Sequence, residues 1–174
     1  MIEVLVTLVI IAFGLLGMAG LQSRLQVSEM EAYQRAQALV LLNDMASRIA
    51  TNRSGAALYD ATEVGPSSNC ASDFSGTSAP MVDQREWCTA LQGAAEITSS
   101  SKLGAVIGGR GCVESLGNGE HMVTIAWQGL VPVSAPPDSV TCGSTQYNTG
   151  GATGCTAELC RRTVTTIVRI APLI

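Results

Sequence analysis

The feature that most constrains this chain is an uncharged apolar run from Val4 to Leu21, in which Thr7 is the only polar side chain. A helix over this run would be about 27 Å long, close to the hydrocarbon thickness of a bilayer. A cleaved signal peptide would begin with basic residues, whereas this chain has the acidic Glu3 at that place. We therefore predict that residues 1–21 form a transmembrane helix with a carboxylate at its head.

The sequence continues to favour helix beyond this run. Residues 23–52 contain no Gly or Pro, and Ala38, Leu42, Met45 and Ile49 follow one another at alternating steps of four and three. This spacing places the apolar side chains on one face and is typical of an amphipathic helix that packs on a domain. We predict one long helix, with a membrane part at 1–21 and an amphipathic part at 22–54, followed by a globular head at 55–174.

Glycine recurs at every third position in the second half of the membrane part, at Gly14, Gly17 and Gly20. Each glycine lowers helix stability by about 1 kcal/mol relative to alanine. Two interpretations are open. The helix could unwind locally once it leaves the lipid, or the small residues could allow close packing against another helix.

The head contains strand signals near its middle and its end. Asn118-Gly119 lies between two short apolar runs, which is typical of a β-hairpin. In VTIAW at 123–127, the large apolar residues Val123, Ile125 and Trp127 fall on one face, and RRTVTTIVRI at 161–170 repeats this alternation. A short helix is predicted over VDQREWCTALQGA, with Asp83 as its N-cap. The head is therefore predicted to be α+β, with at least three antiparallel strands that the amphipathic helix covers on one face.

All the cysteines lie in the head, and their number is even. An even number in a loop-rich region indicates disulfides and an oxidising compartment. Free thiols are an alternative, whereas zinc is disfavoured by the absence of C-x-x-C and the single histidine. Sequence proximity favours a bond between the first two cysteines, and the pairing of the other four stays open. The six residues are Cys70, Cys88, Cys112, Cys142, Cys155 and Cys160.

Composition and motifs exclude several functions. With 10 basic and 14 acidic residues, the chain lacks the positive charge that strong nucleic-acid binding requires. GGRG at 108–111 lacks the Lys-Ser/Thr of a phosphate-binding loop, and no serine stands in G-x-S-x-G. His121 begins a strand and is interpreted as a surface residue. We expect no catalysis, cofactor or metal, and we interpret the scattered carboxylates as solvated surface: Asp83, Glu86, Glu114 and Glu120.

The first residues, MIEVLVTLVIIAFGLLGMAGLQ, resemble the segment that follows the prepilin peptidase site in type IV pilins. The resemblance implies a type IV pilin fold, with a long helix packed on a small antiparallel sheet with disulfide-bonded loops. It also implies that Glu3 neutralises the N-terminal amine of a neighbouring subunit in a filament. The alternative for Glu3 is a carboxylate without a partner in the headgroup layer.

The position of the acid differs from the family pattern. Type IV pilins carry it at the fifth mature residue, whereas here it is residue 3. The resemblance therefore implies either that a leader and two mature residues precede Met1, or that Met1 is an internal methionine.

Within the family, GLLGMAGLQ, DQREW and VTIAWQG resemble the PilV subgroup of minor pilins, and Gly20 stands where major pilins usually carry proline. This resemblance implies a subunit that primes assembly and lies at or near the tip of a type IV pilus. Its expected partners are the major pilin and other minor pilins, with a tip adhesin as a further candidate. Its expected location is the inner membrane, with the head in the periplasm, and then the extracellular filament.

Two other functions stay open. The chain could be a minor pseudopilin of a type II secretion system, whose helix is similar. It could also be a surface-anchored adhesin that binds a ligand through residues 131–160. The sequence does not distinguish adhesion, twitching motility and DNA uptake as the process served.

Overall fold

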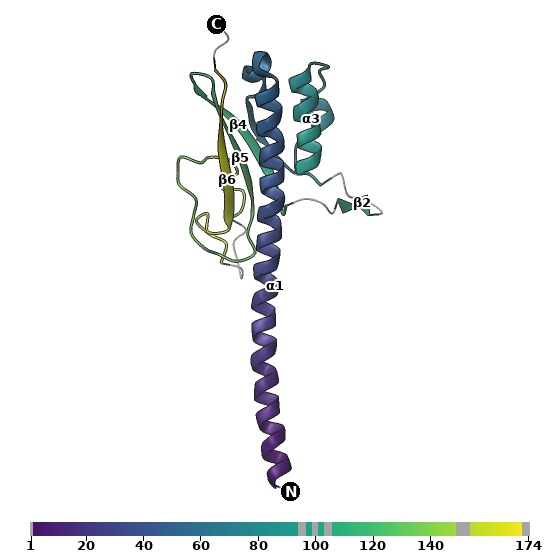
Figure 1. Ribbon diagram of the computed structural model, residues 1–174, viewed down its shortest axis with the longest axis vertical. Helices are drawn as coiled ribbons and strands as arrows, with labels where there is room; N and C mark the ends of the chain where they lie inside the picture. The colour runs from purple at the N-terminus through teal and green to yellow at the C-terminus, as the bar shows by residue number, and fades with distance from the viewer. Residues whose placement is uncertain (1, 94–96, 99–100, 103–105, 149–153, 172–174) are drawn as a thin grey trace. The chain divides into compact units, whose positions relative to one another are not determined.

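A computed structural model describes residues 2–93, 97–98, 101–102, 106–148 and 154–171 of the protein (Figure 1). The chain divides into two compact units, Met1–Tyr33 and Gln34–Ile174, which we call the arm and the head. The last part of the long helix, from Gln34 to Thr51, thus belongs to the head. The elements are α1 (Ile2–Thr51), the 3-10 helix η1 (Arg53–Tyr59), β1 (Ala61–Val64), α2 (Cys70–Asp73), α3 (Ala79–Leu91), β2 (Ile97–Thr98), β3 (Ser101–Lys102), β4 (Arg110–Gly117), β5 (Glu120–Gln128) and β6 (Arg161–Arg169).

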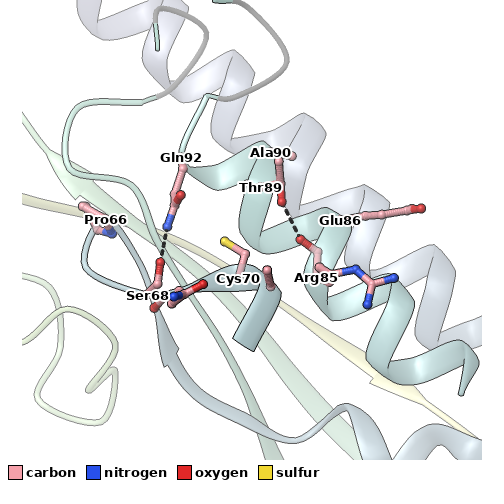
Figure 2. A pocket seen from close by; sticks show the side chains of 10 residues that line it. Pro66, Ser68, Cys70, Arg85, Glu86, Thr89, Ala90 and Gln92 are labelled. Atoms are coloured by element: carbon pink, nitrogen blue, oxygen red, sulfur yellow. Dashed lines mark hydrogen bonds between the residues drawn. The ribbon is translucent and has the colours of Figure 1, made fainter. Parts of the chain in front are cut away.

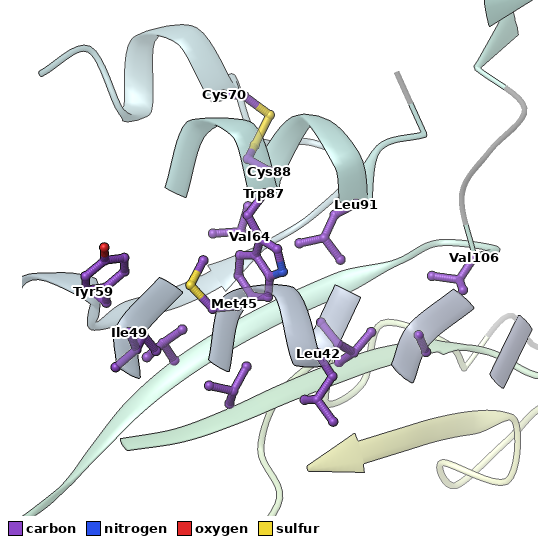
Figure 3. Close-up of a cluster of buried hydrophobic side chains, with 14 of the residues drawn as sticks. Leu42, Met45, Ile49, Tyr59, Val64, Cys70, Trp87, Cys88, Leu91 and Val106 are labelled. Carbon is purple, nitrogen blue, oxygen red and sulfur yellow. A yellow bond between two sulfur atoms is a disulfide. The ribbon is translucent and has the colours of Figure 1, made fainter. Parts of the chain in front are cut away.

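The apolar stripe predicted for the second half of α1 is confirmed. Ala38, Leu42, Met45 and Ile49 are all buried in the main core of the head. Figure 3 shows this stripe beside side chains of α3 and the sheet. The indole of Trp87 adds a polar tie, because its Nε1 donates to the carbonyl oxygen of Leu41 at 3.0 Å. The helix is therefore fixed in the head by apolar burial and by at least one directed hydrogen bond.

The head contains a four-stranded antiparallel sheet in the order β1-β4-β5-β6. The sequence signals correspond to β4, β5 and β6, while β1 was not predicted. The hairpin between β4 and β5 is confirmed, with Asn118 at φ 55° and Gly119 at φ 77°. Glycine is required at 119, because a Cβ there would run into the carbonyl oxygen of Ile170.

Strand β5 is buried on both faces of the sheet. The alternation in its sequence did not predict burial of the second face. Val123 and Ile125 face the main core. Ala126 points to the other face and is buried with Cys142 and Tyr147 in a second, smaller cluster. The loop between β5 and β6 therefore covers part of the sheet rather than extending freely into solvent.

The phenol of Tyr147 makes this second cluster sensitive to high pH. Its hydroxyl donates to the carbonyl oxygen of Gly108 at 2.8 Å, and burial raises the pKa of Tyr147 well above its ordinary value. The unfolded chain then ionises first, at about pH 10, so the stabilising contribution is complete below that pH and is lost as the pH rises further. Urea unfolding between pH 8 and 11 should show a steeper loss of stability in the wild type than in Tyr147→Phe. The exposed control Tyr33→Phe should follow the wild type, and equal slopes in all proteins would contradict this account.

The helix α3 is present, but the predicted N-cap is wrong. The helix begins at Ala79 with Ser78 as its N-cap, and Pro80 lies in the first turn, where a missing N–H costs nothing. Asp83 lies inside the helix, and its carboxylate accepts hydrogen bonds from other elements. The position of Asp83 ahead of Trp87 and Leu91 predicted the helix correctly but placed its start too late in the sequence.

All six cysteines form disulfides, so the alternative of free thiols is wrong. The favoured Cys70–Cys88 bond is present and joins α2 to α3. A second bond, Cys112–Cys142, ties β4 to the loop after β5, and a third, Cys155–Cys160, closes a short loop before β6. The Cα–Cα distances of 5.5, 5.9 and 5.2 Å lie in the ordinary range for a disulfide.

Candidate assembly site

The arm presents a continuous apolar surface. Ile2, Phe13 and Leu16 are 77%, 70% and 68% exposed, and no residue in the most apolar 18-residue window of α1 is buried. By length and composition, α1 could span a membrane. Exposed apolar area is unfavourable in water by about 25 cal/mol per Å². The arm is therefore suited to lipid or to the helices of other molecules.

Glu3 lies in the first turn of α1 and is exposed. The helix dipole favours a carboxylate at this end. No hydrogen bond or ion pair joins Glu3 to any residue that the structure describes. In apolar surroundings an unpaired carboxylate costs several kcal/mol. The position can therefore serve as an acceptor for a positive group from another molecule.

The three glycines of the arm are not required by packing within the chain. A methyl group added at Gly14, Gly17 or Gly20 would meet no other side chain or neighbouring segment within 4 Å. None of them has the positive φ that only glycine adopts easily. Local unwinding and close packing against another helix both stay open as reasons for their presence.

In the head, three carboxylates converge on Arg48 of α1, which sequence reasoning missed. Nη1 of Arg48 lies 2.8 Å from both Asp83 Oδ1 and Glu86 Oε2, and Nε lies 3.1 Å from Asp44 Oδ1. Asp83 and Glu86 are therefore not scattered, because they share one cation, while the side chain of Glu86 is exposed as predicted. Their spacing of three residues on one helix face was a signal, but the sequence did not indicate which cation they would meet.

Hydrogen bonding sets the protonation of this cluster. Burial alone would lower the pKa of Arg48, but its hydrogen bonds to Glu86, Asp44 and Asp83 outweigh burial and raise the pKa. Burial, followed by the hydrogen bond that Tyr59 donates to Asp83, raises the pKa of Tyr59 above its ordinary value. The cluster therefore contains a permanent cation and a neutral phenol, and it fastens α1 to α3.

Replacing Arg48 by Met should destabilise the head while keeping most of the apolar stem. The three carboxylates would lose their cation and repel one another. Because they are partly exposed and screened by water, we expect a loss of about 1–2 kcal/mol in the free energy of unfolding. Chemical denaturation at low and high salt measures this loss, and high salt should reduce it. The exposed control Arg35→Met should have little effect, and an equal effect of the two variants would contradict a role for the cluster.

The other predicted surface groups lie apart from Arg48. Glu114 accepts a hydrogen bond from Thr141 at 3.2 Å, and Glu120 pairs with Arg169 at 2.7 Å. The prediction that His121 is a surface residue is wrong. Its side chain is buried, and its Nδ1 lies 3.1 Å from Asp60 Oδ1. Within the described part of the chain, no group of His, Cys, Asp or Glu could hold a metal ion.

A cavity of about 800 Å³ lies between α2 and α3 (Figure 2). Many of its polar side chains already bind their neighbours. Nε2 of Gln92 donates to the carbonyl oxygen of Ser68 at 2.7 Å, and Nη1 of Arg85 donates to that of Phe74 at 3.1 Å. Glu86 at its edge belongs to the Arg48 cluster. The cavity therefore offers no cluster of uncommitted polar groups.

A long N-terminal helix, a four-stranded antiparallel sheet and three disulfides define an α+β, pilin-like arrangement. Comparison of this chain with protein-family models, curated proteins and solved structures finds no match. The fold class predicted from the sequence is confirmed by the structure itself.

Proposed function

We propose that this protein is a minor pilin, similar to the PilV subgroup, that primes assembly of a type IV pilus and is incorporated at or near its tip. The observation that carries the proposal is the single helix α1, which is exposed and apolar in the arm and packed in the core of the head. A subunit of this kind can exchange lipid for neighbouring helices without refolding its head. Its role is structural rather than enzymatic.

The details of the arm support assembly rather than simple anchoring. A lipid anchor has no need of a carboxylate, yet Glu3 precedes the uncharged run. In a bundle of helices, that carboxylate would pair with the N-terminal amine of a neighbouring subunit and set the axial position of the incoming one. The glycines would then allow the arm to bend or to pack closely within the bundle.

The head supports the proposed location. Three disulfides are typical of proteins that mature in an oxidising compartment. We therefore place the subunit in the inner membrane, with its head in the periplasm, before it enters the extracellular filament. Its proposed partners are the major pilin and other minor pilins, and a tip adhesin is a further candidate.

Deletion of the gene tests this proposal against its alternatives. We expect loss of surface pili, restored by the wild-type protein, while type II secretion continues. Loss of secretion with normal pili would instead identify a minor pseudopilin. Normal pili and secretion, with the protein retained in the membrane and ligand adhesion lost, would identify an anchored adhesin.

A further inference from the structure

A second cavity of about 520 Å³ lies in the head where η1, the β4–β5 turn and the end of β6 meet. Its volume is ordinary for a small-ligand pocket. Ala56, Ala57 and Ile170 supply apolar lining, while Arg53 and His121 supply polar groups. The cavity thus combines a small apolar surface with two side chains that can carry positive charge.

His121 is one of the residues that line this cavity. The side chain is buried, and its Nδ1 lies 3.1 Å from Asp60 Oδ1. No other hydrogen bond joins the ring to the residues that the structure describes. With Nδ1–H donating to Asp60, Nε2 is the ring atom that remains for a ligand, and it donates when the ring is protonated.

Arg53 contributes a guanidinium at the exposed edge of the cavity. Its hydrogen bond within the described chain runs from Nη2 to the carbonyl oxygen of Ala171 at 3.3 Å. No described carboxylate lies within ion-pair distance of it. A guanidinium with free N–H groups on one side favours a planar, bidentate anion.

We propose that this cavity binds a carboxylate carried on a small apolar group. The carboxylate would pair with Arg53 and approach Nε2 of His121, while its aliphatic part would contact Ala56, Ala57 and Ile170. Such a group could come from the C-terminus of a partner polypeptide or from its Asp or Glu side chain. The site is separate from the arm, so its ligand can be tested without any filament.

The pocket should bind more tightly as the pH falls. Asp60 and Arg53 are the charged groups that border His121, since Glu120 and Arg169 next to it pair with each other. A bound carboxylate near Nε2 would favour the imidazolium over the neutral ring. Binding and protonation of His121 should therefore reinforce each other.

NMR of the full chain in detergent micelles tests the ligand class. His121 is the only histidine, so its ring signal can be followed without assignment. The probes are acetyl-Ala-Ala with a free carboxylate, acetyl-Ala-Glu-amide and acetyl-Ala-Ala-amide. We expect at least one carboxylate peptide to shift the ring signal, and the tighter of the two identifies the source. Equal binding of the uncharged amide, or no binding by either carboxylate peptide, would overturn the proposal.

Variants measured by calorimetry test the residues. Arg53→Gln should weaken binding of the carboxylate peptide by about ten- to a hundredfold, the loss expected for a charge-assisted hydrogen bond. His121→Gln should weaken binding at low pH and remove its pH dependence. The control Arg35→Gln, on α1, should bind like the wild type. Wild-type affinity in Arg53→Gln, with an unchanged melting temperature, would overturn the assignment.

Discussion

Full reduction of the disulfides is expected to lower the free energy of unfolding of the head by several kcal/mol. Removing a native disulfide from a small secreted domain typically costs about 2–5 kcal/mol. The bonds should not contribute equally, because closing a longer loop removes more entropy from the unfolded chain. Cys112–Cys142 spans 30 residues in sequence and Cys155–Cys160 only 5. The first of these should therefore contribute more than the second.

Urea unfolding with and without a phosphine reductant measures this effect, with mass spectrometry to confirm complete reduction. Paired serine variants then separate the bonds. Cys112→Ser with Cys142→Ser should destabilise the head more than Cys155→Ser with Cys160→Ser, and it should also expose the second cluster around Tyr147. An unchanged melting temperature after full reduction would contradict a stabilising role for the disulfides.

Replacing Glu3 by Ala is expected to abolish most incorporation into filaments while leaving the head folded. Glu3 lies in the arm and makes no hydrogen bond or ion pair within the described chain, so its loss removes no contact of the head. In a helix bundle, the same substitution would leave the neighbour's amine without its carboxylate, at a cost of several kcal/mol. Immunoblots of sheared filaments and of membranes measure the distribution of the protein, and circular dichroism checks the head.

Two further variants test whether the charge of Glu3 and its position on α1 are required for incorporation. Glu3→Gln keeps the size and polarity of the side chain but removes its charge, and it should also fail to enter filaments. Glu29→Ala removes an exposed carboxylate further along α1 and should be incorporated normally. Normal incorporation of Glu3→Ala would reject the docking role of this residue.

The parts of the fold that were predicted depend on local pattern. The stripe through Met45, the Asn118-Gly119 turn and the alternation in β6 each arise from spacing along a single segment. β1 escaped prediction because four residues are too few for a periodicity to appear. Burial of Ala126 was not predicted, because the side chains that cover it come from the loop between β5 and β6, which is distant in sequence.

The candidate sites divide in the same way. The roles of Glu3 and of the glycines in the arm stay predictions, which arose because an acid precedes the uncharged run and glycine recurs within it. The Arg48 cluster and the pairing of His121 with Asp60 were missed, because each joins residues from elements that only the tertiary structure brings together. The spacing of Asp83 and Glu86 placed both carboxylates on one face of α3. It carried no information about Arg48, their partner on α1.

Quantitative mass spectrometry of sheared wild-type filaments tests the central claim most directly. The measurement gives the ratio of this protein to the major subunit and the residue at its mature N-terminus. A minor pilin predicts a trace, substoichiometric amount in the filaments, with an N-terminus produced by prepilin processing. Absence from the filaments, with the full amount retained in the inner membrane, would contradict the assignment.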